Sequence, residues 1–525
     1  MSKHSLGLKK GDDDLEVQVS QSTYLRKQSW KFLNSRKLWW YFPECYDAFK
    51  VSGRQAVRRG RKILTGVIPI VASYFLLSFL DRSNLGNARV AGLQESLHMS
   101  DHQFSLAITL TFVPYIVVEL PANLLLKKLG PKFFLPTIIT IWGLVTMLQG
   151  FVKSFNGLIC ARVFLGLAEG GMMPGIVLYL SYFYTRNEMQ WRIALFFASA
   201  SLSGAFSGLL AYCLVKLDGK GGLDGWAWIF IVEGLFTCCW GILSYFFFLD
   251  SIDASRFLTV NEKKILITRL QKDRAKAPID ETFSWAEVMQ SFASPHVLMV
   301  VLAFFLSGTS AFSMAYFQPT IIKSFGYSNS LTQLLSVPPY AVAFIWMMIS
   351  SYVSDKYGLR GLTISFCALI GLVGYILFFV AEASQKPLKY TSLFLSITGI
   401  YSCTPPLLAW ISNNSAGSYR RATSIALGCV GANLGGICGT WIFPSSESPK
   451  YRTGTIINIA FSCGVIIVTI INLVYLRKVN EHKTKNSEKI LSKYKTSDNN
   501  MDFKQNNSEA WQELGDKHPN FTYVY

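Results

Sequence analysis

The stretch C-A-R-V-F-L-G-L-A-E-G-G-M-M-P-G, Cys160–Gly175, places an arginine and a glutamate inside an otherwise apolar segment. Arg162 and Glu169 are seven residues apart. On an α-helix this spacing brings the two side chains to within about 20° of one direction, about 10.5 Å apart along the axis. Gly166 lies near the same face, where we expect open space. Charges inside hydrocarbon are costly, so the stretch predicts a membrane-spanning helix with a functional charged face. A structural ion pair that only joins helices is the alternative.

The composition also indicates a membrane protein. Of the 525 residues, 51% are hydrophobic and only 16% are charged, and the mean hydropathy is +0.30. The net charge of +18 does not indicate nucleic-acid binding, because the basic residues fall mainly in the tails and in alternate loops. The ten cysteines include no C-x-x-C pair and are typical of packing residues. We expect no metal site and no cofactor.

Apolar segments of about 20 residues are long enough to span a bilayer. Twelve such segments occur, at 63–83, 104–126, 133–152, 157–182, 191–214, 227–249, 296–318, 333–353, 361–381, 391–412, 421–443 and 455–476. A charged linker, 250–295, divides them six and six. The sequence therefore predicts an all-α membrane protein with twelve transmembrane helices in two six-helix bundles, 61–249 and 296–478, with tails at 1–60 and 479–525.

Basic residues recur in every second connection, which sets the expected orientation. They lie in the N-terminal tail, at Lys127, Lys128, Lys132, Arg186, Lys356, Arg360, Arg420 and Arg421, in the linker, and in the 477–485 region. The positive-inside rule then predicts that both termini are cytosolic. We expect a monomer in the plasma membrane.

The ionisable residues inside the predicted spans all belong to the first half: Asp81, Arg82, Glu119, Arg162, Glu169 and Glu233. The second half offers neutral polar groups instead: Tyr316, Gln318, Tyr401, Trp410, Asn413 and Asn433. No histidine lies deep in a span, so protons would have to be carried by carboxylates. Asp81 and Glu169 are the candidate proton carriers. For Glu119, a gate or structural role is favoured over a proton site, and Glu233 is expected to be structural.

Small residues and prolines predict how the helices pack. Gly204 and Gly208, with Gly428, Gly431, Gly435 and Gly439, are expected to form close helix contacts rather than ligand contacts. Pro405 and Pro406 are expected to bend the tenth span, because each removes a backbone donor.

The loop S-Y-V-S-D-K-Y-G-L-R, Ser351–Arg360, resembles the loop motif G-x-x-x-D-[RK]-x-G-x-[RK] of the major facilitator superfamily. The loop N-L-L-L-K-K-L-G-P-K, Asn123–Lys132, occupies the corresponding place in the first half, with Lys127 instead of the acid. The resemblance implies gate or structural roles for Asp355, Lys356 and Arg360.

Several stretches also resemble the fungal allantoate-permease branch of the anion:cation symporter family. They are F-L-D-R-S-N-L-G-N-A-R-V-A-G (79–92), E-L-P-A-N-L-L-L-K-K-L-G-P (119–131), R-V-F-L-G-L-A-E-G-G-M-M-P-G (162–175), G-W-A-W-I-F-I-V-E-G (225–234) and W-I-S-N-N-S-A-G-S-Y-R-R-A (410–422). This resemblance implies proton-coupled uptake of a small organic anion by alternating access. It implies proton coupling at Asp81 and Glu169 and anion binding at Arg82, with Arg162 as the partner in the fourth span. Leu64 and Gly66 depart from the family pattern before the first span.

The expected function is therefore a secondary transporter that imports a small carboxylate with protons across the lipid bilayer. Arg82 and Arg162 would bind the carboxylate, although the depth of Arg162 favours an electrostatic effect on Glu169. Tyr115, Tyr316, Gln318, Trp410 and Asn433 would complete the pocket, and their aromatic rings favour nicotinate among the family's substrates. A non-transporting nutrient sensor of the same fold is the alternative. No nucleophile with a nearby base or nucleotide loop indicates an enzyme.

Overall fold

The structure is a computed structural model. It describes residues 53–181, 183–184, 186–248, 259–261, 263–264, 266–268, 285–382, 384–416, 418–492, 514–519 and 521–525. Residues Lys62–Tyr525 form one unit. The predicted tail is described only from residue 53, and most of the predicted linker lies outside the described residues.

Helices account for almost all of the described chain. The first half contains α2 (Gly53–Val90), α3 (Leu93–Ser96), α4 (Asp101–Leu129), α5 (Pro131–Gln149), α6 (Phe155–Glu169), α7 (Met172–Ser181), α8 (Arg186–Leu214) and α9 (Gly225–Phe247). The second half contains α11 (Trp285–Phe292), α12 (Pro295–Lys323), α13 (Asn329–Tyr357), α14 (Arg360–Val380), α15 (Lys386–Tyr401), α16 (Thr404–Asn413), α17 (Ser418–Gly439), α18 (Arg452–Lys485) and α19 (Ser487–Ser492).

These helices confirm the predicted fold class. Within the described residues, eight helical segments are long and apolar enough to cross a membrane: α5, α9, α12, α13, α14, α15 with α16, α17 and α18. The helices α2, α4, α6 with α7, and α8 complete a set of twelve. Three of these four contain ionisable residues, namely Arg82, Glu119 and Glu169, and α6 and α7 are each short because the fourth span is interrupted.

The fourth and tenth spans are each interrupted. The fourth breaks between α6 and α7 at Gly170 and Gly171, and the tenth breaks between α15 and α16 at Ser402 and Cys403. The second break lies directly before the two prolines from which a bend was predicted. Interruptions at corresponding positions of two halves are typical of transporter binding sites.

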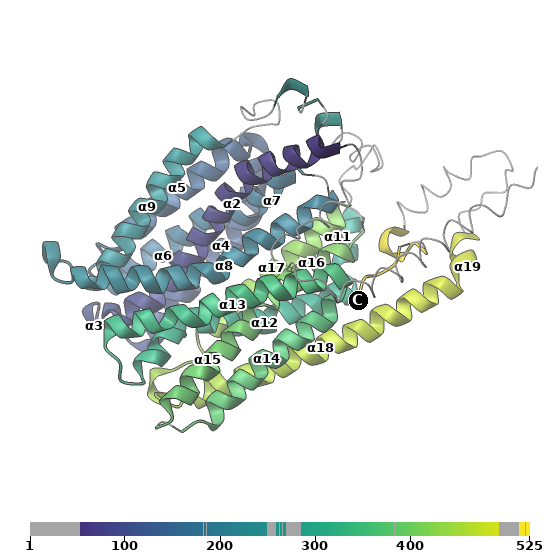
Figure 1. Ribbon diagram of the computed structural model, residues 1–525. Helices are drawn as coiled ribbons and strands as arrows, with labels where there is room; N and C mark the ends of the chain where they lie inside the picture. The colour runs from purple at the N-terminus through teal and green to yellow at the C-terminus, as the bar shows by residue number, and fades with distance from the viewer. Residues whose placement is uncertain are drawn as a thin grey trace, which may run out of the picture. The chain divides into compact units, whose positions relative to one another are not determined.

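Glycines allow the helices of each half to pack closely. Side chains at Gly428, Gly431, Gly435 and Gly439 of α17 would collide with α12, and glycines of α5 and α9 face each other's backbones in the same way. Figure 1 shows α9 beside α5. The predicted role of the α17 glycines in helix contact is confirmed. The open space expected at Gly166 is wrong, because Thr111 and Pro114 of α4 fill it.

Helix pairs also connect the two halves. Gly204 and Gly208 of α8 fit against Tyr340 and Ser336 of α13, which lies beside α8 in Figure 1. We call the side where α2 ends and α4 begins the far side, and the side where α18 ends the tail side. On the far side, Lys323 Nζ donates to the Val90 carbonyl at 3.0 Å.

Further hydrogen bonds close the far side between the halves. Gln333 Nε2 donates to the Asn87 carbonyl at 3.0 Å, and Ser105 Oγ donates to the Thr440 carbonyl at 2.8 Å. These bonds join the ends of α2 and α4 to those of α13 and α17, so the two halves are held together at this level.

Residues 514–519 and 521–525, here called the C-terminal strap, pack on the tail side of the second half. Asp516 pairs with Arg420 of α17, and the two side chains are only 2% and 4% exposed. The Val524 carbonyl accepts from Trp410 Nε1 and Asn414 Nδ2, both at 3.0 Å. The strap therefore fastens the ends of α16 and α17, in a segment that the sequence predicts only as a cytosolic tail.

Candidate functional site

A cavity lies between the two halves, and its interior admits water-sized molecules over about 110 Å³. This is room for several water molecules or one small solute. Both interrupted spans border it, through Met172 and Met173 of α7 and through Tyr401, Thr404 and Pro405 at the second break. The cavity therefore lies beside the two interrupted spans, where interruptions are typical of a transporter binding site.

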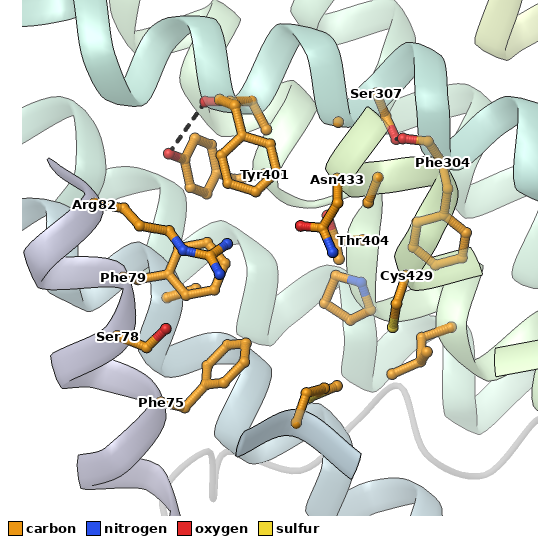
Figure 2. A pocket seen from close by; sticks show the side chains of 18 of the residues that line it. Phe75, Ser78, Phe79, Arg82, Phe304, Ser307, Tyr401, Thr404, Cys429 and Asn433 are labelled. Carbon is orange, nitrogen blue, oxygen red and sulfur yellow. Dashed lines mark hydrogen bonds between the residues drawn. The ribbon is translucent and has the colours of Figure 1, made fainter. Parts of the chain in front are cut away.

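One face of α2 forms the charged wall of this cavity. Phe75, Ser78, Phe79 and Arg82 line it at helical positions i, i+3, i+4 and i+7. Figure 2 shows Arg82 extending into the cavity from α2, with Asn433 of α17 facing it. The predicted ligands Arg82, Tyr115 and Asn433 all line the cavity.

Arg82 is paired with the glutamate of the fourth span. Its Nη2 donates to Glu169 Oε1 at 2.8 Å, and the side chains are 11% and 2% exposed. Ser78 Oγ donates to the same carboxylate oxygen. The carboxylate therefore binds one nitrogen of the guanidinium, while Arg82 also lines the cavity and has further donors that a ligand could use.

Aromatic rings surround the guanidinium of Arg82. Its central carbon lies 5.3 Å from the ring centroids of Phe79 and Tyr115, 5.7 Å from Phe112 and 5.6 Å from Phe312. These rings stabilise the cation while excluding water. An anion that reaches Arg82 would therefore interact with it in a medium of low dielectric constant, where the attraction is strong.

Asp81 and Arg162 lie away from this cavity, inside the first half. Consecutive residues of a helix point about 100° apart, so Asp81 faces α5 and accepts from Thr146 Oγ1 at 3.4 Å. Arg162 is 3% exposed and does not line the cavity. Its position does not support direct contact with a substrate, and its electrostatic effect on Glu169 stays a prediction.

Three further predicted ligands do not line the cavity either. Tyr316 packs its backbone against Gly86 of α2, and Gln318 Nε2 donates to the Ser336 carbonyl at 3.3 Å. Trp410 is bound to the C-terminal strap. The positions of these side chains do not support the predicted contacts with substrate.

The predicted gate residues occupy separate places. Asp355 pairs with Arg360 in the turn between α13 and α14, where Gly358 adopts a positive φ of 67°. Lys356 is exposed beside two tyrosine rings. Glu119 is half-buried on α4, one turn beyond Tyr115. Neither oxygen of buried Glu233 has a hydrogen-bond partner among the described residues.

Sequence reasoning missed several lining residues, among them Phe79, Phe312, Thr404 and Ser307. For α2 a signal exists, because counting back from Arg82 in helical steps finds Phe79, Ser78 and Phe75. The Gly170–Gly171 pair could likewise have predicted the break in the fourth span. The positions of Phe312 and Ser307 on α12 depend on the packing of the second half against the first.

Comparisons with known proteins agree with this architecture. The family model described as Major Facilitator Superfamily matches residues 71–440. The protein named Uncharacterized transporter C1002.16c from Schizosaccharomyces pombe is 34% identical over 417 residues, covering 79% of this chain and 83% of that protein. The major facilitator-type transporter hxnP of Emericella nidulans is 30% identical over 431 residues, covering 81% and 86%.

Solved structures show the same fold at low sequence identity. A bacterial homologue of the human lysosomal transporter Spinster, in an inward-facing conformation, matches with a TM-score of 0.61 and 15% identity, covering 78% of this chain and 96% of that one. The xylose transporter XylE from E. coli matches with a TM-score of 0.60 and 13% identity, covering 78% and 98%. The chain therefore belongs to the Major Facilitator Superfamily and is a multi-pass membrane transporter.

Proposed function

We propose that this transporter imports a small organic anion together with protons, by alternating access across the plasma membrane. The observation that carries the proposal is the Arg82–Glu169 pair at the edge of a cavity between the halves. The guanidinium of Arg82, which lines the cavity, supplies the anion site. The buried carboxylate of Glu169, which is bound to that guanidinium, supplies the proton site.

Competition for Arg82 couples the two ions. An incoming carboxylate binds the guanidinium and weakens its hold on Glu169. A carboxylate left without its counter-charge inside the membrane is strongly disfavoured, so Glu169 takes up a proton. The protonated group can then donate to Ser78, its present hydrogen-bond partner. The transporter therefore binds the anion and the proton together, in one conformational state.

The lining of the cavity favours an anion with a flat or apolar body. Phe75, Phe79, Phe304 and Phe312 form much of the wall, while Ser307, Thr404 and Asn433 supply a few polar groups. An aromatic monocarboxylate such as nicotinate can stack on these rings. An anion rich in ureido or hydroxyl groups, such as allantoate, would leave more of its polar atoms unpaired.

The conformation fits one end of an alternating-access cycle. With both termini in the cytosol, the far side faces the exterior and is closed by the bonds from Lys323, Gln333 and Ser105. Transport requires these bonds to break in the opposite state. The Asp355–Arg360 pair lies within the second half and does not bridge the halves.

Uptake into proteoliposomes tests the proposal. Radiolabelled nicotinate and a panel of other small carboxylates are offered with and without an imposed pH gradient, acidic outside. We expect accumulation that follows the gradient. Arg82→Gln is expected to abolish binding and uptake, whereas Glu169→Gln is expected to lose pH-driven accumulation while retaining exchange.

A second ion pair of the same chain supplies matched controls. Arg477 and Glu481 pair at 3.3 Å on α18 but are 76% and 57% exposed. Arg477→Gln and Glu481→Gln should leave uptake unchanged. Accumulation that ignores the pH gradient would rule out symport, and binding of a carboxylate without any uptake would establish the sensor instead.

A further inference from the structure

A second pocket lies on the far side, at the boundary between the two halves. Its interior admits water-sized molecules over about 530 Å³, and small-molecule sites typically measure about 300–1,000 Å³. Its walls come from both halves and include Gln94, Glu95 and Asp101 of α3 and α4, Thr320 and Lys323 of α12, and Tyr451 before α18. None of the residues that line it also lines the cavity containing Arg82. The far-side pocket is therefore separate from the candidate transport site.

Two of the charged residues in this pocket, Arg89 and Asp101, are bound to each other. Arg89 Nη2 donates to Asp101 Oδ1 at 2.7 Å, and Arg89 Nε donates to Gln94 Oε1 at 2.8 Å. Gln94 Nε2 donates to the same Asp101 oxygen at 2.9 Å. The charges of Arg89 and Asp101 therefore offset each other, and their bonds hold the wall of the first half together.

Two other charged residues of the lining, Lys323 and Glu95, are not bound to each other. Lys323 Nζ donates to the Val90 carbonyl at 3.0 Å and has no ion pair within the described chain. An ammonium group has three donors, so two remain. Glu95 is exposed and within electrostatic range of Arg89, but its carboxylate has no bonded partner among the described residues. The pocket therefore combines an available cation of the second half with an available anion of the first.

Hydroxyl groups lie in the same wall as Lys323. Thr320 precedes Lys323 by one turn of α12, and its Oγ1 has no hydrogen-bond partner in the part of the chain that the structure describes. Ser448 is exposed in the lining. A carboxylate that binds the ammonium of Lys323 can also accept from hydroxyl groups, because each carboxylate oxygen accepts more than one hydrogen bond. This wall is therefore suited to a carboxylate.

We infer that the far-side pocket is a second binding site, for a small zwitterion such as an amino acid, whose carboxylate binds Lys323 and whose ammonium group binds Glu95. A molecule with a single charge would satisfy only one of these residues. Lys323 and Glu95 belong to different halves, so the bound zwitterion joins the halves on the far side. Opening of the far side would separate the two walls, so the zwitterion stabilises the closed far side. It acts beside the transport cavity, whichever anion is transported.

Calorimetry with a series of probes tests the site. The full-length protein is purified into lipid nanodiscs, and glycine, β-alanine, γ-aminobutyrate and 6-aminohexanoate, which differ in the separation of their charges, are titrated at neutral pH. We expect one of them to bind about tenfold more tightly than the simple amine and the simple carboxylate of the same chain length, because each of these lacks one charged contact. Absence of binding by the whole series, or equal binding of the simple carboxylate, would overturn the proposal.

Variants then locate the bound probe. Glu95→Gln should weaken its binding by about fivefold, the upper value for an exposed charge pair, and should remove its advantage over the simple carboxylate. Glu382→Gln, an exposed far-side position outside the pocket, is the matched control and should change nothing. Arg82→Gln should also leave this binding unchanged. Equal binding to Glu95→Gln would overturn the site, and loss of binding in Arg82→Gln would place the probe in the transport cavity instead. Absence of anion uptake would reject only the proposed function.

Spin labels test whether the zwitterion joins the halves. Gln333→Ala removes another bond that closes the far side, and Gln333 does not line the pocket. Labels on Lys220 and Gln385, which are exposed on the far side of the first and second halves, should report a population of long distances in this variant. Saturating zwitterion should shift that population toward short distances. A distribution that the bound zwitterion leaves unchanged would overturn the joining role.

Discussion

Replacing Asp516 with alanine is expected to release the C-terminal strap from the transporter. Asp516 pairs with Arg420, accepts from Tyr523 Oη at 2.8 Å and is 2% exposed. Removing one partner of a buried ion pair costs about 3–5 kcal/mol, because the other charge stays buried without compensation. The protein can avoid this penalty by undocking the strap, which exposes Arg420 to water.

The released population can be measured by hydrogen exchange. The amides of Tyr523 and Val524 donate to the side-chain oxygens of Asn480 and Asn414 at 3.0 and 2.8 Å. Each 1.4 kcal/mol corresponds to about a tenfold change, so the exchange of these two amides should accelerate on the order of 10²- to 10³-fold. Lys517→Ala, at the exposed neighbouring position, should change little. Protection that stays within a few-fold of the parent would refute the reasoning.

Three further predictions concern packing, pH and the far side. Gly435→Leu should destabilise the protein by about 1–3 kcal/mol, because the new side chain meets the backbone of α12; an unchanged thermal midpoint would contradict this. Burial and the charge of Lys483 lower the pKa of His518, so the released strap binds a proton below about pH 6.5 that the docked strap does not. The protection factor of the strap amides, which is their exchange rate corrected for the intrinsic rate of a free amide at the same pH, should therefore fall as pH is lowered from 7 toward 5. His518→Gln should remove this dependence, and a dependence that survives in this variant would contradict the assignment. Lys323→Met removes the bond to the Val90 carbonyl, worth about 1 kcal/mol. Spin labels at the far-side ends of α4 and α12 should then report a larger population of long distances, and an identical distribution would argue against a gating contact.

The sequence was sufficient to predict the number of spans and to find the buried Asp81, Arg162, Glu169 and Glu233 in those of the first half, although α15 of the second half also buries Lys389. Both depend on local properties, namely the length of apolar segments and the identity of residues within them. The signal from Pro405 and Pro406 was equally local, and the helix is interrupted directly before them. The helical spacing of Arg162 and Glu169 correctly placed both side chains on one buried face of α6.

The pairing of those charges could not be predicted from spacing. Glu169 bonds to Arg82 of another helix, because the rotation of α2 is set by its packing against the rest of the half. Trp410 was a reasonable ligand by its type and depth, but its indole binds the Val524 carbonyl, 114 residues away in the chain. Contacts at such separations depend on tertiary structure that periodicity does not encode.

Phe312 of α12 explains how an anion bound in the first half would affect the second. Its ring stacks on Phe79 with centroids 6.2 Å apart, meets Phe112 edge-on at 5.3 Å, and lies 5.6 Å from the guanidinium of Arg82. Glu169 occupies one side of that guanidinium, so a substrate carboxylate has to approach on the side of the rings. Under the proposed function, an anion that fills the cavity would therefore have to displace these rings and change the packing between α2 and α12. A ligand shifts a conformational equilibrium only through contacts that differ between the two states. The proposed anion would therefore act on the closure of the halves through these contacts between Phe79, Phe112 and Phe312.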